Sequence, residues 1–78
     1  MKIKILKPEQ LVFEGEIQMA QLPGSDGSFG IMNSHAPMVA SLGKGKIRVI
    51  VEDGNTSFFD INGGVVEVKN NEILVLAE

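Results

Sequence analysis

The chain contains no cysteine, tryptophan or tyrosine, and its only aromatic side chains are four phenylalanines. The lack of cysteine excludes disulfides and thiolate metal sites, so the fold must be held by packing and backbone pairing. The formal net charge is −3, and phosphate binding needs a basic surface. Together with the scarcity of stacking side chains, this charge argues against a nucleic-acid-binding protein.

Long apolar runs are also lacking. No stretch approaches the ~20 residues that a membrane-spanning helix requires. The first ten residues, MKIKILKPEQ, hold no long apolar segment followed by a small-residue cleavage site, so they do not resemble a secretory signal. We therefore expect no direct insertion into the membrane, and the expected compartment is the cytoplasm.

Helical periodicity is the third absence. No window shows a sustained 3.6-residue pattern with a cap, and valine and isoleucine outnumber leucine and alanine, which favours pleated strands. With 44% hydrophobic and 22% charged residues, the composition is that of a folded protein. We predict one all-β domain over residues 1–78, a β-sandwich of roughly ten short strands with no substantial helix.

The strands are read from alternation. Met1, Ile3 and Ile5 alternate with lysines, which predicts a half-buried strand. In the segment LVFEGEIQMAQL, Gly15 is expected to break or bulge a strand pair, with Ile17 and Met19 on one face.

Two hairpins are expected in the second half of the chain. Ile47, Val49 and Val51 share one face of a strand, and Asp53-Gly54 after it predicts a tight two-residue turn. TSFFDI would be the returning strand. Asn70-Asn71, between VVEVK and EILVLAE, predicts another two-residue turn.

Catalytic and metal sites are not indicated. The single histidine, His35, follows Ser34 and precedes Asp60, but the nucleophile-elbow pattern G-x-S-x-G is absent and no metal-ligand spacing occurs. The glycines of the stretch GSDGSFG lack the spacing and the lysine of a phosphate-binding loop. We predict no catalytic residue, metal or cofactor. The expected structural turns and close backbone approaches involve Gly24, Gly30, Gly63 and Gly64.

The segment LPGSDGSFGIMNSHAPMVASLGKGKIRV carries a resemblance to a known family. It is similar to the amino-terminal domain of the epsilon subunit of F-type ATP synthases, which shows Gly-x-x-Gly-x-Phe/Leu-Gly-Ile, then Gly-His-Ala-Pro, then Gly-x-Ile/Val-x-Val. INGGVVEV and ILVLAE resemble the Gly-Gly segment and closing strand of that family, so the resemblance covers the whole chain. The matching residues are Gly24, Gly27, Phe29, Gly30, Ile31, His35, Ala36, Pro37, Gly45, Ile47 and Val49.

The resemblance implies a flattened ten-stranded β-sandwich in the central stalk of a proton- or sodium-translocating ATP synthase. It implies a non-catalytic rotor subunit that joins the gamma subunit to the c-ring, peripheral to the cytoplasmic face of a bacterial plasma membrane. The implied c-ring contact loop is Ser25, Asp26, Gly27, Ser28 and Phe29. The implied gamma contacts are Lys7, His35, Met38, Val39 and Ala40.

Three departures from the family pattern qualify this expectation. Asn33-Ser34 stands where the family has Pro-Gly, and Ser28 stands where relatives often have an acid, so a c-ring ion pair would pass to Asp26. Most relatives continue into two inhibitory helices that help some of them bind ATP, and this sequence ends at Glu78. We expect that residues 1–78 neither inhibit ATP hydrolysis nor bind nucleotide.

A second function class remains open at this point. A free-standing β-sandwich could bind a small ligand or a peptide. The two classes differ in their surfaces, because a rotor subunit needs a sizeable exposed apolar patch for gamma and a monomeric module exposes little.

Overall fold

The computed structural model describes all residues from Met1 to Glu78, and it contains eight β-strands and no helix. No helix is therefore available to cross a lipid bilayer. The all-β prediction is confirmed, with eight strands in place of about ten. The strands are β1 (Lys2–Lys7), β2 (Gln10–Gly24), β3 (Gly27–Met32), β4 (Met38–Leu42), β5 (Gly45–Val51), β6 (Thr56–Ile61), β7 (Gly64–Lys69) and β8 (Glu72–Ala77).

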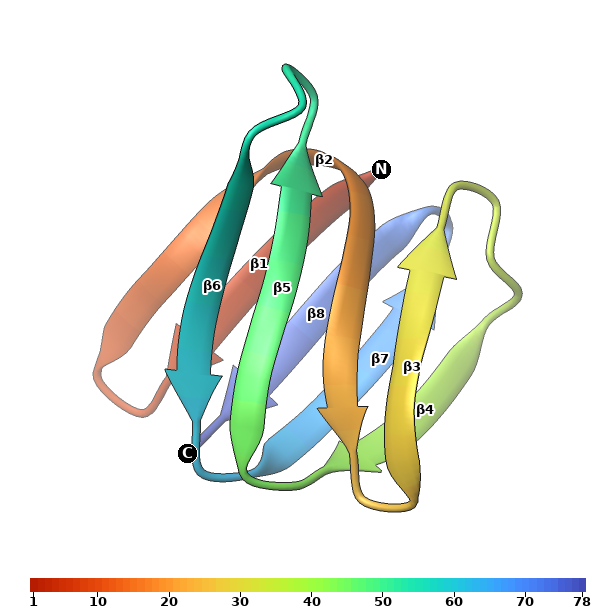
Figure 1. Ribbon diagram of the computed structural model, residues 1–78. Coiled ribbons are helices and arrows are strands. Elements are labelled where there is room, and N and C mark those ends of the chain that lie inside the picture. Colours follow the sequence, from red (N-terminus) through yellow and green to blue (C-terminus); the bar gives the residue numbers. More distant parts are fainter.

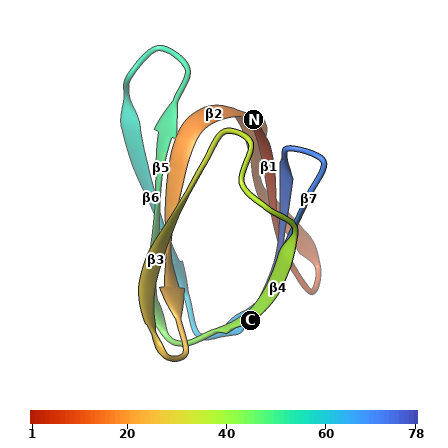
Figure 2. The same ribbon diagram turned by 90° about the vertical axis from the view of Figure 1, so that its right-hand side faces the viewer.

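The strands form two layers that share β2 (Figure 1). The first layer consists of the first half of β2 followed by β1, β8, β7 and β4, and the second consists of β6, β5, the second half of β2, and β3. β1 and β8 run parallel, and every other pair is antiparallel. The side view shows the two layers face to face, so the sandwich prediction is confirmed (Figure 2).

The length of β2 explains why the strand count is lower than predicted. Gly15 does not break this strand, since it lies opposite Ile3 in a register with β1 that is regular from Lys2–Glu16 to Ile5–Phe13 and shifts only between Ile5 and Leu6. A β-carbon at Gly15 would lie 3.4 Å from the ring of Phe13, so this ring covers the bare backbone of the glycine. The expected break or bulge at Gly15 is wrong, because the register shift with β1 falls before Phe13, and β2 runs through both layers as one strand.

A second irregularity in β2 comes three residues after Gly15. The register with β5 shifts between Ile17 and Met19, at the bend where β2 leaves the first layer and joins the second (Figure 1). Ile17 is fully buried, but beyond the shift the buried positions are Ala20 and Leu22, while Met19 is half-buried on the other side. The prediction that Ile17 and Met19 share a face is therefore wrong, because a bulge moves the alternation by one residue.

The core lies between the layers and contains only apolar side chains. Alternation predicted its β1 and β5 members correctly, and Val51 at the end of β5 is half-buried. Burying one such branched side chain stabilises the fold by about 1.5–3 kcal/mol. The buried set is Met1, Ile3, Ile5, Ile17, Ala20, Leu22, Ile31, Leu42, Ile47, Val49, Ile61, Val66, Val68, Ile73, Val75 and Ala77.

The two predicted hairpins form, but only one has the predicted turn. Asn70 and Asn71 have φ of 54° and 61°, as a primed two-residue turn requires, and this prediction is confirmed. At the other hairpin the Gly54 amide donates to the Val51 carbonyl at 2.9 Å, and the Val51 amide donates to the Asn55 carbonyl at 2.9 Å. The loop is thus longer than the predicted two-residue turn at Asp53-Gly54, with Gly54 at φ 93° closing it as a bulge.

Candidate functional site

The predicted c-ring contact loop forms the turn between β2 and β3, where Ser25 and Asp26 occupy the tip. The Ser25 amide donates to the Ser41 carbonyl at 3.0 Å, and the Ser41 hydroxyl donates to the Ser25 hydroxyl at 2.9 Å. The Gly43 amide donates to the Pro23 carbonyl at 2.8 Å just beyond. These bonds tie the turn to β4, so a short exposed loop is held on a rigid base.

The members of this loop differ in what they can offer a partner. Ser25, Asp26, Gly27 and Ser28 are exposed, and Asp26 has no ion pair within the chain. Phe29 is half-buried and packs against the core, and its ring lies over Gly24. Phe29 therefore anchors the loop, and the free surface consists of the four residues before it.

The structure does not bring the predicted gamma contacts together. Val39 projects from the outer face of β4 with 69% of its surface exposed, whereas Met38 and Ala40 face inward and pack against the core. Lys7 ends β1 and His35 lies in the β3–β4 loop, at opposite ends of the first layer. Of these five residues, only Val39 lies on the outer face of the first layer that carries the exposed apolar side chains.

The loop containing His35 is ordered by its neighbours. Ser34 adopts a φ of 65°, and its backbone amide donates a hydrogen bond to the side-chain oxygen Oδ1 of Asn71 at 2.9 Å. Nδ1 of His35 lies 2.7 Å from the Ala36 carbonyl. Asp60, on β6, accepts a hydrogen bond from Lys46 at 2.8 Å. Ser34, His35 and Asp60 thus do not form one site.

Three of the four glycines that we expected at turns or close approaches lie there. A β-carbon at Gly24 would lie 2.5 Å from the Gly27 carbonyl oxygen, and one at Gly64 would collide with the Leu76 backbone. Gly63 and Gly64 also have φ of 146° and 147°, which favours glycine. Gly30 was predicted wrongly as a turn residue, because it lies within β3 opposite Gln21.

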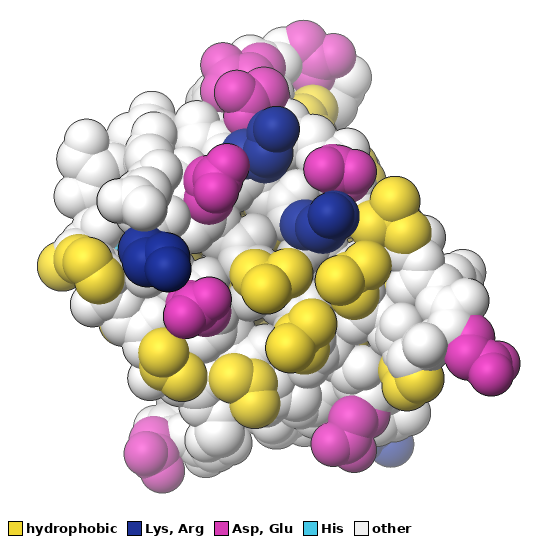
Figure 3. All heavy atoms as spheres, turned by 180° about the vertical axis from the view of Figure 1, so that it is seen from behind, with side chains coloured by type: hydrophobic (Ala, Val, Ile, Leu, Met, Phe, Trp, Pro, Cys, Tyr) yellow, Lys and Arg dark blue, Asp and Glu magenta, His cyan; other side chains and the backbone are white.

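An exposed row of apolar side chains crosses the outer face of the first layer. In the strand register, Val65 of β7 lies opposite Leu76 of β8, Leu76 lies beside Leu6 of β1, and Leu6 lies opposite Leu11 of β2. Leu11 and Leu76 are each 51% exposed and Val65 is 44% exposed. We call these four residues the apolar row; Figure 3 shows the hydrophobic cluster on this face.

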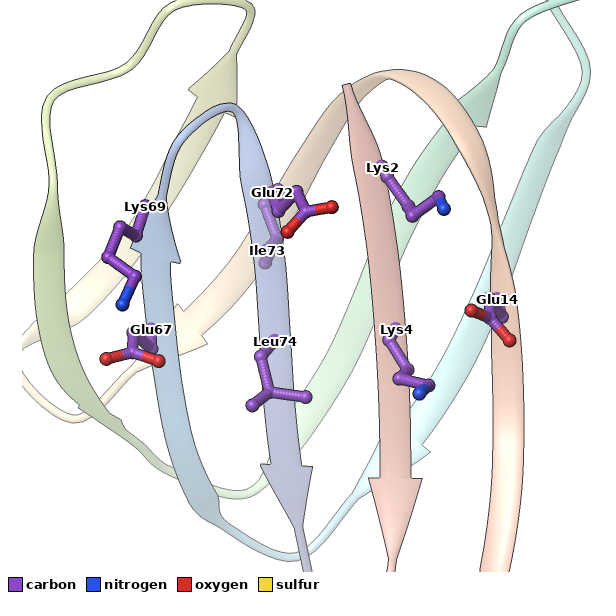
Figure 4. A pocket seen from close by; sticks show the side chains of 8 residues that line it. All are labelled: Lys2, Lys4, Glu14, Glu67, Lys69, Glu72, Ile73 and Leu74. Atoms are coloured by element: carbon purple, nitrogen blue, oxygen red, sulfur yellow. The ribbon is translucent and has the colours of Figure 1, made fainter.

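Charged side chains border the apolar row toward the amino-terminal end of β1. Figure 4 shows six of them around a hollow over β7, β8, β1 and β2, with Leu74 between them. Strand register sets unlike charges beside each other, as with Lys4 and Glu14, yet none approaches within 4.0 Å. The charged members are Lys2, Lys4, Glu14, Glu67, Lys69 and Glu72.

Sequence reasoning missed the apolar row, although a signal for it exists. In EILVLAE, the core-facing residues of β8 are Ile73, Val75 and Ala77, so a strand exposed on one face should be polar at Leu74 and Leu76. Both are leucine. A strand that is apolar on both faces is the pattern of a strand covered on both sides.

No group of three or more histidine, cysteine, aspartate or glutamate side chains is arranged to hold a metal ion. The pKa of Asp60 lies below its ordinary value because Lys46 donates a hydrogen bond to this carboxylate and attracts it electrostatically. Lys7 adds a smaller attraction. Both Lys46 and Asp60 are well exposed, so this pair is a surface feature.

Comparison with known proteins gives this surface a context. The sequence matches the family described as the ATP synthase delta/epsilon chain β-sandwich domain over residues 1–78. It is 42% identical over 77 residues to the ATP synthase epsilon chain of Chlorobium limicola, covering 99% of this chain and 88% of that protein. It is 38% identical over 78 residues to the ATP synthase epsilon chain of Leptospira interrogans, covering all of this chain and 61% of that protein.

Solved structures share the fold at low sequence identity. A chain of the Euglena gracilis mitochondrial ATP synthase superimposes with a TM-score of 0.90 at 18% identity, covering 96% of this chain and 48% of that one. A chain of the central stalk and c-ring of the Tetrahymena thermophila enzyme gives 0.79 at 19% identity, covering 99% and 62%. The match to the family over its full length shows that this chain belongs to the ATP synthase delta/epsilon chain β-sandwich domain family.

Proposed function

We propose that this chain is a non-catalytic rotor subunit of an ATP synthase that joins the gamma subunit to the c-ring. In this role it transmits rotation and supports the coupling of ion flow to ATP synthesis, peripheral to the cytoplasmic face of the membrane. Support comes from its relatives, which are named ATP synthase epsilon chains, and from its structural neighbours in assemblies described with a c-ring.

The observation that carries the proposal is the apolar row. Val39 and half-buried Leu74 extend it on the same outer face, so apolar side chains reach this face on all four strands from β4 to β1, with exposed ones on β4, β7 and β8. A monomeric protein rarely leaves so continuous an apolar surface in water, and an apolar centre with a polar rim is the anatomy of a protein interface. The proposed occupant of this face is gamma.

The β2–β3 turn is the proposed contact with the c-ring. It lies at the end of the sandwich away from the amino terminus, beside the β4–β5 and β6–β7 turns (Figure 1). Its hydrogen bonds to Ser41 and Pro23 hold it stiffly, which suits an element that transmits a mechanical load. Asp26 at its tip offers a carboxylate to basic residues of the c-ring loops.

Co-purification tests the proposal. The tagged chain, added to membranes that carry the ATP synthase but lack its own epsilon subunit, should recover both gamma and c subunits after gentle detergent extraction. The matched control is the same chain after heat unfolding and removal of aggregates. The unfolded chain should recover neither gamma nor c subunits. Failure of the folded chain to recover either subunit from an otherwise intact complex would refute the rotor role and favour a free-standing binding module.

A further inference from the structure

The side of the sandwich between β3 and β4 is bordered by two unpaired strand edges. β3 pairs only with β2, and β4 pairs with β7 and touches β2 at a single position, Gly24 opposite Leu42. Figure 2 looks directly onto this side and shows no strand between β3 and β4. Backbone donors and acceptors along both edges therefore face outward.

Alternation identifies the free backbone groups of β3. Gly24 and Gly27 flank the two-residue turn at Ser25-Asp26 and form the first pair of the ladder with β2. Every second residue then bonds to β2, namely Phe29 and Ile31. The amides and carbonyls that point to the open edge belong to Ser28, Gly30 and Met32, and no bond outside the ladders involves them.

On β4, the same alternation leaves one position with free backbone groups. The Ser41 carbonyl and the Gly43 amide point toward β2 and are bonded to Ser25 and Pro23. Val39 lies two residues before Ser41, so its backbone amide and carbonyl also point toward β2. They have no hydrogen-bond partner there. Its side chain meanwhile lies on the outer face that carries the apolar row.

The β3 edge carries none of the features by which proteins protect an exposed edge. Its sequence, GSFGIM, has no charge and no proline. The outer edge of the first layer, by contrast, carries Glu14 and Glu16 on β2, and the edge strand β6 carries Asp60. An unprotected edge of six residues is a template for another strand.

We propose that an extended segment of the gamma subunit adds to the sheet along the open edge of β3. This inference rests on the proposed function and names how that partner is held. Gamma is the occupant because the open side between β3 and β4 adjoins the outer face proposed to dock gamma: Val39 of β4 directs its free backbone groups to this side and its side chain to that face (Figure 2). The uncharged edge fits a segment with small or apolar side chains, which would cover the half-buried Phe29, Met38 and Ala40 from the side.

Hydrogen exchange measured on the free chain and on its complex with purified gamma tests the pairing. The amides of Ser28, Gly30 and Met32 should exchange rapidly in the free chain and about 100-fold more slowly in the complex. The amides of Phe29 and Ile31 should be protected in both states. Binding of gamma without new protection at the three outward amides would overturn the inference and leave the proposed function standing.

A pair of substitutions at Gly30 gives a second measurement. Gly30→Pro removes an outward amide that takes no part in the β2 ladder, and proline is tolerated on edge strands. Gly30→Pro should weaken gamma binding about tenfold, because that is the change in affinity expected from the loss of one hydrogen bond. Gly30→Ala keeps the amide and adds a β-carbon 3.4 Å from the flexible end of Met19, so it should bind normally.

The outcomes separate the two proposals. If gamma does not bind the wild-type chain, the proposed function itself fails, and the inference falls with it. If the three amides become protected in the free chain as its concentration rises, the occupant is a second copy of the chain and not gamma. If Gly30→Pro lowers the melting temperature markedly, Met32→Pro, which removes another outward amide near the end of β3, replaces it.

Discussion

On the outer face of the second layer, Arg48 donates to the Gln21 side-chain oxygen at 2.8 Å, and Gln21 donates to the Ser28 hydroxyl at 2.9 Å. Lys46 and Asp60 pair on the same face at 2.8 Å. On the outer face of the first layer, six charged side chains form no ion pair, and the apolar row lies in water beside them.

The difference indicates which face the protein completes by itself. Polar side chains on the outer face of the second layer form hydrogen bonds with one another across β5, β2 and β3. These groups are therefore paired already in the isolated chain. Its exposed apolar side chains, Phe58 and Met32, lie on opposite edge strands with β5 and β2 between them. The first layer leaves both its apolar and its charged groups without partners, which is the condition of a surface that a partner covers.

Matched substitutions of one exposed apolar side chain on each face should give the largest difference. Leu76→Glu places a charge in the apolar row and should weaken gamma binding by roughly 2 kcal/mol, about 30-fold. Phe58→Glu makes the same kind of change on the other face and should alter binding less than about twofold. Titration calorimetry with purified gamma measures both. Equal losses for the two variants would remove the distinction between the faces.

Unfolding of the free chain should show the reverse order. Gln21→Leu removes the acceptor of the half-buried Arg48 and should lower the free energy of unfolding by about 1.5–3 kcal/mol, the range for hydrogen bonds to charged groups. Lys2→Gln removes an unpaired lysine of the first layer and should change it by less than ~0.5 kcal/mol. Urea unfolding followed by circular dichroism measures both free energies. An equal loss for Lys2→Gln would show that the charged side chains of the first layer stabilise the free chain.

Local sequence patterns predicted much of the fold. The alternation of β1 and β5 placed Ile3 and Ile47 in the core, and Asn70-Asn71 specified a turn that needs positive φ at both positions. These features depend on contacts within one strand or one hairpin. The bulge after Ile17 could not be read in the same way, because it arises where β2 changes partners from β1 to β5.

The candidate site was less accessible to prediction for the same reason. Val65, Leu76, Leu6 and Leu11 come from four strands, and only the register that links distant segments puts them in one row. Resemblance to a family named Met38, Val39 and Ala40 together, whereas alternation along β4 exposes Val39 and turns Met38 and Ala40 toward the core. The roles of all five predicted gamma contacts and of the β2–β3 turn stay predictions.

The turn at the end of the sandwich should contribute less than either face. Asp26→Asn removes an exposed carboxylate and should weaken binding to the c-ring by only ~0.2–1 kcal/mol, an effect that salt reduces. Glu52→Gln, in the β5–β6 loop at the other end, is the matched control and should have no effect (Figure 1). Binding to isolated c-rings at low and high ionic strength measures this term. Unchanged binding of Asp26→Lys at low salt would show that the carboxylate does not face the c-ring.

The smallest expected effect concerns the ion pair between Lys46 and Asp60 on the outer face of the second layer. Lys46 holds the pKa of Asp60 below its ordinary value, so Lys46→Met should raise this pKa toward that value, with the weaker attraction of Lys7 remaining. A carboxylate whose folded pKa is lowered stabilises the fold above its unfolded pKa, and this contribution is lost as the pH falls through the folded pKa. Lys46→Met should therefore flatten the acid limb of the stability curve slightly and leave binding of gamma unchanged. Carboxyl-carbon chemical shifts of Asp60 followed through an acid titration measure the shift directly, and an identical titration curve in the variant would mean that Lys46 does not form this pair in solution.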